Sequence, residues 1–493
     1  MARCDKAAGA RRPAARLAIA LLLTLVTAAA GCTSGGDDGG AAPTSPTKEI
    51  QDYTGPGVQG AGHPIGLKWD WSTLDRYLPF VRDLTGGATF YEFEWCQVEP
   101  RQGQLDWGVV DRIVRSSQRL GYELMLKIRV GSCWATGGRH GEERGAKRKT
   151  VSAMPQDLEA YEGFVRTVVE RYRPLGVRQY AIENEVNARN FWDGSPEQYE
   201  QLARAGGRAV HDADPKAEVL DSGIASPIYG VAIAERLLTQ GREGEAVAAY
   251  QRYYARRGSQ YARVETAEEL RSVLARALVR RGLTYLAATQ RLAREKAFDV
   301  YQLHFYEPWD NTAALLEYLH ATLPSTLPIE GWEVGMFQHG AFQQSEDQQV
   351  RAGEAAKVVS LLLAGGVRRV VWLPVAAPED AKELRFGLVD AGGGVRPAGE
   401  VVKRLAAAAE GATRRAVTSG GTSGVAFGKG EQTVLVLWSE HGATLPGAAR
   451  SGAKASTLSG ASVPWGKAGL RLGSEPFLIS LPLTINEAAR LVR

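Results

Sequence analysis

The sequence predicts an α/β fold, a closed (β/α)8 TIM barrel followed by a small all-β domain. Short β-like runs alternate with helical patterns over residues 61–410, which is typical of parallel strands joined by helical crossovers. With 493 residues, the chain is long enough for a full barrel and a second unit, since single cores stop growing near ~250–300 residues. Beyond residue 410, short strand-like runs with Gly-rich turns replace the long helices, which favours a β-sandwich over residues 411–493.

Eight runs are expected to form the barrel strands, with helices between them. The helix after the fourth strand is the best marked, because Ser195 starts a capping-box pattern and Pro196 follows in the first turn. The expected strands are Ile65–Trp69, Ala88–Trp95, Glu123–Val130, Val177–Ile182, Glu218–Asp221, Phe298–His304, Leu327–Trp332 and Arg369–Leu373. The expected helices include Trp107–Leu120, Asp157–Tyr172, Pro196–Asp212, Asn311–Leu323 and Glu346–Ala364.

An insertion separates the fifth and sixth expected strands. Residues 241–296 are helix-rich and charged, and they account for most of the length beyond the ~250 residues of a minimal barrel. Because the segment follows the C-terminal end of a strand, it is expected on the face where barrels carry their sites. It is either a wall of that site or a solvated decoration.

The first 31 residues are typical of an export signal. Basic residues precede an apolar run from Leu17 to Ala30, which is shorter than the ~20 residues that span a bilayer. The run ends in Ala29-Ala30-Gly31-Cys32, which resembles the lipobox of bacterial lipoproteins and implies a lipid on Cys32 and a place in the cell envelope. An ordinary signal peptide is the alternative. Residues 32–60 then predict a flexible tether, because their first part is rich in Gly, Ser, Thr and Pro.

The charge balance argues against a polyanionic partner. Residues 1–31 hold five of the 59 basic and one of the 55 acidic residues, so the rest of the chain is balanced and no nucleic-acid partner is expected. Membrane association is expected through the lipid alone. The seven histidines show no metal-binding spacing and no phosphate-binding loop is present, so no metal and no cofactor are expected. Cys96 and Cys133 fit a disulfide or two buried thiols equally well.

Acidic side chains follow two expected strands at the point where each strand ends. The fourth strand leads into Glu183-Asn184-Glu185, and the seventh ends in Trp332-Glu333. Barrel enzymes place their catalytic groups at this edge of the barrel. Because buried charge is costly unless it is paired, a cleft explains these polar groups better than packing does.

The same residues resemble the motifs of glycoside hydrolase clan A, over residues 65–410. Members carry Asn-Glu after strand four, with this Glu as acid/base, and a second Glu near strand seven as nucleophile. Asn184-Glu185 and Glu333-Val334-Gly335 match these motifs. Three further segments match the clan's pattern on strands two, six and eight: Tyr91–Trp107 with its Glu99-Pro100 pair, His304-Phe305-Tyr306, and Trp372.

The resemblance implies a retaining glycosidase acting on a β-linked glycan or glycoside. Glu333 would attack the anomeric carbon while Glu185 protonates the leaving oxygen, and Glu185 would then activate water. Asn184 would bind the sugar 2-hydroxyl, and His304 and Tyr306 would orient Glu333 or contact sugar. Trp372, Trp95 and Glu94 are the further candidates for substrate contacts, while Glu183 and Glu330 fit neither catalytic motif. A non-catalytic sugar-binding lipoprotein and a transglycosylase using the same residues are the alternative functions.

Overall fold

The structure is a computed structural model, and it describes residues 49–138, 150–255, 262–336, 347–376, 387–447 and 452–492. The expected export signal, the lipidation site Cys32 and the first part of the tether lie outside the described residues and stay predictions. Within the described ranges, no helix combines the length and the apolar character needed to cross a membrane.

Eight parallel strands form two four-stranded sheets, in the orders β2-β3-β4-β5 and β1-β8-β7-β6. Isolated parallel bridges from Leu220 to Val300 and from Ile224 to Leu303 join the sheets between β5 and β6. On the other side β1 lies against β2 so closely that a Cβ on Gly66 would stand 2.2 Å from the Ala88 carbonyl oxygen. The strands are β1 Ile65–Leu67, β2 Ala88–Glu94, β3 Glu123–Arg129, β4 Gln179–Ile182, β5 Glu218–Leu220, β6 Tyr301–Phe305, β7 Ile329–Val334 and β8 Val367–Trp372. The predicted α/β fold with parallel strands is confirmed.

A layer of apolar side chains fills the middle of the barrel. Because side chains alternate along a strand, residues two positions beyond this layer point inward nearer the C-terminal ends of the strands. Glu92 therefore points inward above Phe90, and Lys127 points inward above Met125. The layer consists of Ala88, Phe90, Met125, Ala181, Leu220, Val300, Trp332 and Val371.

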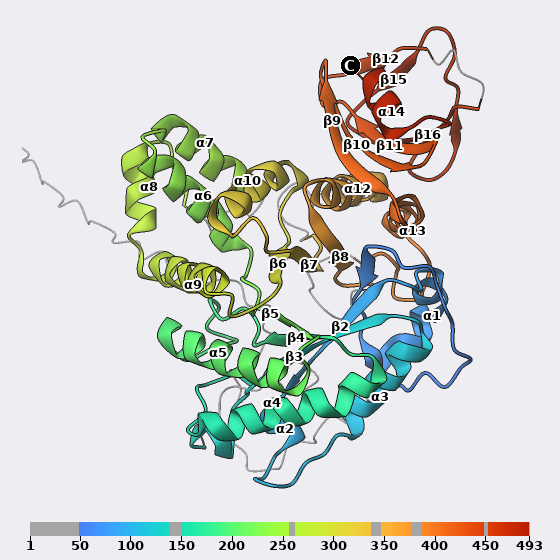
Figure 1. Cartoon of the computed structure of the whole chain (residues 1–493). Helices are drawn as coiled ribbons and strands as arrows, with labels where there is room; N and C mark the ends of the chain where they lie inside the picture. Colours follow the sequence, from blue (N-terminus) through green and yellow to red (C-terminus); the bar gives the residue numbers. More distant parts are fainter. Residues whose placement is uncertain are drawn as a thin grey trace, which may run out of the picture.

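Helices cover the outside of the strands (Figure 1). The predicted start of α5 is confirmed, since Ser195 Oγ accepts the Gln198 amide proton at 3.2 Å and Gln198 Oε1 accepts the Ser195 amide proton at 2.8 Å. Pro196 occupies the first turn. The covering helices are α1 Leu74–Asp83, α3 Gly108–Arg119, α4 Leu158–Tyr172, α5 Pro196–Ala213, α10 Thr312–Thr322, α12 Gln348–Ala364 and α13 Pro397–Ala409, with the short α2 Trp95–Val98 directly after β2.

The insertion between β5 and β6 extends this helical layer. It holds α7 Glu243–Tyr254, α8 Ala267–Leu274 and α9 Ala277–Arg294, after α6 Pro227–Thr239. In Figure 1 α7 and α8 lie on α6, while α9 lies between that group and α5. The Tyr253 hydroxyl donates to the Ser226 carbonyl at 2.8 Å, which ties α7 to the loop after β5. The predicted helical insertion is confirmed, and its contact with substrate stays a prediction.

The chain after α13 forms antiparallel sheets, as predicted. One sheet has six strands in the order β14-β13-β16-β11-β10-β9, and β12 pairs with β15. Side chains of both sheets and of α14 share one small core, which includes Leu437, Leu472 and Ala488. The elements are β9 Thr413–Ser419, β10 Thr422–Lys429, β11 Gln432–Trp438, β12 Ala443–Leu445, β13 Lys454–Ser456, β14 Ser462–Val463, β15 Leu470–Leu472, β16 Phe477–Leu481 and α14 Ile485–Leu491.

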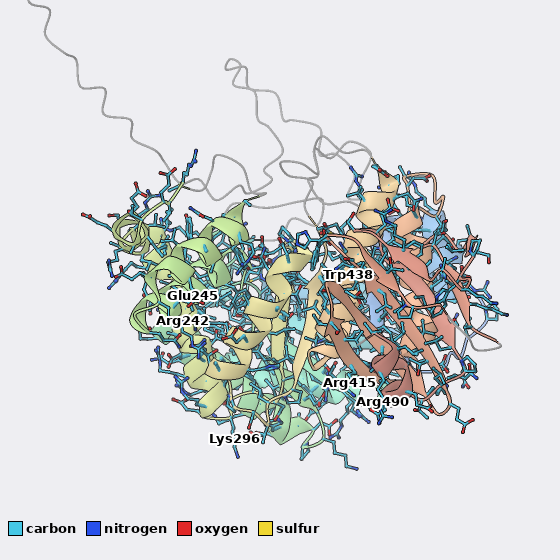
Figure 2. The ribbon with its side chains drawn as sticks, turned by 90° about the horizontal axis from the view of Figure 1, so that it is seen from above. Arg242, Glu245, Lys296, Arg415, Trp438 and Arg490 are labelled. Atoms are coloured by element: carbon cyan, nitrogen blue, oxygen red, sulfur yellow. A yellow bond between two sulfur atoms is a disulfide. The ribbon has the colours of Figure 1, made fainter. Side chains whose placement is uncertain are left out.

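A buried lysine on α12 connects the barrel to this C-terminal region. Lys357 lies with its ammonium 4.4 Å from the ring centre of Trp309 and 5.5 Å from that of Trp438. Its Nζ also donates to Glu440 Oε1 at 2.7 Å. Figure 2 shows Trp438 at the boundary between the barrel and the C-terminal sheet.

Candidate active site

The backbone after β4 is strained where the predicted acid/base lies. Glu183 and Glu185 have φ values of 68° and 41°. Among the described residues, Lys296 is the only other non-glycine residue with positive φ. Such conformations cost about 1–3 kcal/mol each and persist where the surrounding structure enforces them, commonly at functional sites. The Glu185 amide donates to the Ser222 carbonyl at 3.0 Å, which anchors this turn.

The structure brings together the two carboxylates that the sequence singled out. One oxygen of Glu185 and one of Glu333 lie within 4.8 Å of each other and of a ring nitrogen of His304. Nδ1 of His304 is 2.9 Å from Glu185 Oε1 and 3.7 Å from Glu333 Oε2. Retaining glycosidases hold their carboxyl groups ~5–5.5 Å apart, and inverting ones ~6.5–9.5 Å. The limit of 4.8 Å on these two oxygens lies below the separation of inverting enzymes.

Each carboxylate oxygen of Glu333 accepts a hydrogen bond. The Tyr306 hydroxyl donates to Oε2 at 2.9 Å, and the ammonium of Lys127 donates to Oε1 at 2.6 Å. Asn184 also enters the site, because its Oδ1 accepts from Lys127 at 2.9 Å. The predicted site residues Asn184, His304 and Tyr306 therefore lie together with the two glutamates.

Two glycines make room for this arrangement. A Cβ on Gly335 would stand 2.2 Å from the Leu373 carbonyl oxygen and 3.1 Å from the Tyr306 ring. A Cβ on Gly223, where φ is 66°, would stand 2.3 Å from His304 Nε2. The glycine in the Glu333-Val334-Gly335 motif therefore has a packing reason, since a larger residue would displace Tyr306.

Glu185, His304 and Glu333 are spaced so that they could hold a metal ion. A cation is already present at this place, however, because the Lys127 ammonium lies 2.6 Å from Glu333 Oε1 and 3.3 Å from His304 Nε2. A second positive charge there would be repelled by the ammonium. The residues fit a carboxylate pair neutralised by lysine, and we assign no metal to them.

A second buried charge cluster lies beside the site, around Arg129 at the end of β3. Its NH1 donates to Glu92 at 3.2 Å and to Glu94 at 3.0 Å, and its Nε lies 3.5 Å from Glu183 Oε2. Glu94 also accepts from the amide and hydroxyl of Thr150 at 2.7 and 3.1 Å, and it is fully buried. Glu94 thus holds the chain at Thr150, and its contact with substrate stays a prediction.

The predicted stacking tryptophans are buried as well. Trp95 is 2% exposed and packs against Trp134, Tyr161 and Phe164 with ring centres 5.4–5.8 Å apart. Trp372 is fully buried in the main hydrophobic core. Sugar stacking needs an accessible ring face, so the structure supports this role for neither residue.

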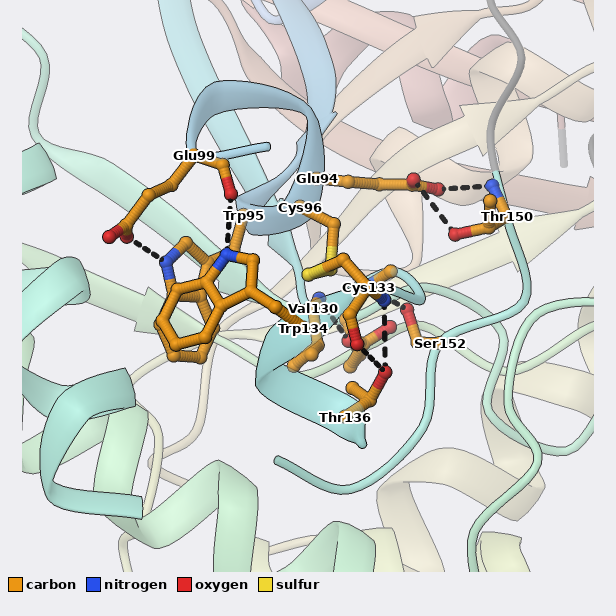
Figure 3. The surroundings of a disulfide bond; sticks show 12 residues. Glu94, Trp95, Cys96, Glu99, Val130, Cys133, Trp134, Thr136, Thr150 and Ser152 are labelled. Carbon is orange, nitrogen blue, oxygen red and sulfur yellow. Dashed lines mark hydrogen bonds between the residues drawn. A yellow bond between two sulfur atoms is a disulfide. The ribbon is translucent and has the colours of Figure 1, made fainter. Parts of the chain in front are cut away.

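A disulfide between Cys96 and Cys133 decides the question that the sequence left open (Figure 3). It joins α2 to the loop after β3. Beside it, the indole N–H groups of Trp95 and Trp134 donate to Glu99, at 2.6 Å to the carboxylate and 2.8 Å to the carbonyl oxygen. The segments that follow β2 and β3 are therefore fastened to each other next to the Arg129 cluster.

Burial raises the pKa of Glu183 to about 7, although the positive charge of Arg129 acts in the opposite direction. A carboxyl group whose pKa is higher in the folded than in the unfolded chain stabilises the fold fully at pH values below its unfolded pKa, near 4.5. That contribution disappears as the pH rises through 7. The folded protein is therefore expected to lose stability over this range because of Glu183.

We expect the Glu183→Gln variant to lack this component. Between pH 4.5 and 8, the free energy of unfolding should fall in the wild type by up to about 3 kcal/mol more than in the variant. Urea unfolding at several pH values measures the difference. Burial also raises the pKa of Asp221 to about 7. Its contribution to the pH dependence is the same in both proteins and drops out of the difference. A pH-independent difference would contradict the expectation.

Sequence reasoning missed three charged residues of the site region, Glu92, Lys127 and Arg129. A signal was present, because Met125, Lys127 and Arg129 alternate with apolar Leu126 and Ile128 on a strand that is buried from Leu124 onward. Two cations on the inward face of a buried strand require anionic partners inside the barrel. The pattern thus pointed to the carboxylates of neighbouring strands.

Comparisons with known proteins agree with this geometry at the level of the fold. A family 39 glycoside hydrolase from the gut symbiont Bacteroides cellulosilyticus WH2 is similar with a TM-score of 0.58 and 14% identity, over 85% of this chain and 81% of that one. The chain has the fold of barrel glycosidases. A family 30 endoxylanase from Clostridium papyrosolvens C71 gives 0.51 and 10% identity, over 86% and 97% of the two chains. A glucosidase from Croceicoccus marinus gives 0.50 and 11%, over 87% and 97%. No protein-family model and no curated protein matches the sequence.

Proposed function

We propose that this protein is a retaining glycosidase that hydrolyses a β-linked glycan or glycoside. The observation that carries the proposal is the spacing of Glu185 and Glu333, whose nearest ligand oxygens lie within 4.8 Å around His304. This spacing leaves room for a sugar carbon between the carboxylates but not for an added water on the opposite face. The similarity in fold to glycoside hydrolases supports the same reaction class.

In the first half-reaction, Glu333 forms a bond to the anomeric carbon while the bond from that carbon to the leaving oxygen breaks. Glu185 gives its proton to the leaving oxygen. Glu333 Oε2 is the attacking atom in this scheme. It faces Nδ1 of His304, which also contacts Glu185, whereas Oε1 accepts from the fully buried Lys127. Tyr306 fixes Oε2 by its hydrogen bond.

In the second half-reaction, water takes the place of the leaving group. Glu185 accepts a proton from this water while the water oxygen bonds to the anomeric carbon. The ester bond breaks, and its electron pair returns to Glu333. Two displacements on one carbon restore its original configuration. Retention at the anomeric carbon is therefore the signature of the proposed function.

The proposal is tested with the full chain on a panel of aryl glycosides, each offered as both anomers. We expect turnover of at least one β-glycoside, with the β-anomer of the free sugar appearing first in a proton NMR time course. The matched α-glycosides serve as the control and should be left intact. Inversion at the anomeric carbon, or an absence of turnover across the panel, would overturn the proposal.

A further inference from the structure

Lys127 is an unusual residue to find in the interior of a barrel. It lies on β3, is fully buried, and points inward between Met125 and Arg129. Its ammonium is 4.4 Å from the ring centre of Phe90, which belongs to the apolar layer beneath the site. A lysine in this position loses most of its hydration, so its charge must be compensated by nearby groups.

The compensating groups are all residues of the candidate active site. The ammonium donates to Glu333 Oε1 at 2.6 Å and to Asn184 Oδ1 at 2.9 Å, and it lies 3.3 Å from His304 Nε2. An ammonium has three protons and no lone pair, and two of these protons are used by Glu333 and Asn184. One cation thus connects β3 with side chains that come from the ends of β4, β6 and β7.

The contact with Asn184 decides which end of that amide faces the ligand. Because Lys127 can only donate, the amide oxygen of Asn184 is turned toward it and the NH2 group is turned away. The amide is therefore presented as a donor, which suits an oxygen on the sugar carbon next to the reacting centre. Without the ammonium, the two orientations of the amide would be less strongly distinguished.

The contact with Glu333 matters in both half-reactions. Before attack, it compensates the negative charge of the carboxylate and holds the side chain in one position. When the glycosyl ester breaks, negative charge returns to Glu333, and a cation fixed 2.6 Å from Oε1 stabilises the departing carboxylate without any rearrangement.

We propose that Lys127 is a positioning residue for this reaction, holding the nucleophile Glu333 and the sugar-binding amide of Asn184 in one fixed arrangement. It touches neither sugar nor water, because it is fully buried. The inference rests on the proposed glycosidase function. It implies that substrates carrying a hydroxyl at C2 depend on Lys127 more strongly than 2-deoxy substrates do.

The kinetic test compares Lys127→Met with the wild type on the best aryl glycoside of the panel and on its 2-deoxy counterpart. We expect kcat on the 2-hydroxy substrate to fall at least ~100-fold with KM changed less than ~3-fold. The loss on the 2-deoxy substrate should be about tenfold smaller, because the contact with Asn184 is absent there. A kcat within ~3-fold of the wild type, or equal losses on both substrates, would overturn the proposal.

Lys357→Met is the matched control. Lys357 is also a buried lysine paired with a glutamate, but it lies against Trp438 of the C-terminal sheet. Its loss is expected to lower stability and to leave kcat and the ratio between the two substrates unchanged. A purely structural role for Lys127 would give the same behaviour in both variants.

A second measurement needs no activity and remains available if Lys127→Met folds poorly. Glu333→Ala leaves the buried ammonium without its closest partner and should lower the urea midpoint of unfolding, whereas the double variant Lys127→Met/Glu333→Ala should recover part of that loss. A double variant less stable than Glu333→Ala would contradict the coupling. If the wild type turns over no glycoside, the proposed function is wrong whatever the stability measurements show. If the wild type is active and Lys127→Met is equally active, only the role of Lys127 is contradicted.

Discussion

Glu333→Ala is expected to lower kcat/KM on aryl β-glycosides by at least about 10⁴-fold, since removal of the nucleophile leaves no group that can form the covalent intermediate. Glu185 remains, and the space left by the carboxylate admits a small anion. Added azide should then restore turnover by attacking the anomeric carbon directly. Only one displacement occurs in that reaction, so the glycosyl azide should have the inverted configuration.

Glu185→Ala gives the complementary result. Its loss should be large for poor leaving groups and small for activated phenols, because activated phenols need no proton as they depart. Azide should here yield a product of retained configuration, since it intercepts the glycosyl ester on Glu333. A retained azide product from Glu333→Ala would reverse the two assigned roles.

Glu330→Gln is the control for the choice of nucleophile on β7. Glu330 is fully buried and accepts from Arg368, Arg369 and Trp332 at 2.5, 3.0 and 2.8 Å. It therefore serves as a structural carboxylate within the barrel. The folded variant should keep its activity, and a loss comparable to that of Glu333→Ala would contradict the assignment.

The strands and the closeness of Glu185 and Glu333 were predictable because they depend on local patterns. Alternating β-like and helical runs predicted all eight strands to within three residues of their observed bounds. Once the strands are placed, parallel topology brings their C-terminal ends to one face. Glu185 and Glu333 stand at two of these ends, so they are expected on the same face. The structure adds the distance between them, which no pattern in the sequence contains.

The structure gives less support to the predicted substrate contacts that lie at the ends of strands buried on both faces. All seven residues of β2 are buried, so apolar alternation could not separate the inward from the outward face. Glu94 and Trp95 are predicted to contact substrate, whereas in the structure Glu94 pairs with Arg129 and Trp95 packs against α4. Trp372, at the end of β8, is likewise buried.

The polar support of the site was missed because its members come from distant parts of the sequence. Lys127 and Glu333 are 206 residues apart, and Arg129 is 54 residues from Glu183, with which it pairs. The cations on the inward face of β3 indicate that anionic partners exist, but they do not show which residues these partners are. Only the closure of the barrel places those partners within hydrogen-bond distance.

The Arg129 cluster leads to the largest expected effect on stability. Arg129 is fully buried and faces three carboxylates, Glu92, Glu94 and Glu183. Its NH2 also donates to the Thr150 carbonyl at 2.8 Å and the Phe191 carbonyl at 3.1 Å. Arg129→Met would remove the only cation shown within 3.5 Å of Glu183 among the described residues.

We therefore expect Arg129→Met to lower the free energy of unfolding by about 3–5 kcal/mol, because buried carboxylates are left without a partner. Urea unfolding at pH 7.5 measures the change. Part of the loss should be recovered at pH 5, where protonation removes the uncompensated charge from Glu183. The control is Arg171→Met, which breaks a partly exposed pair with Asp111 and should cost about 1 kcal/mol or less. Equal losses for Arg129→Met and Arg171→Met would show that the buried cluster tolerates unpaired charge, contrary to the low-polarity environment that the geometry indicates.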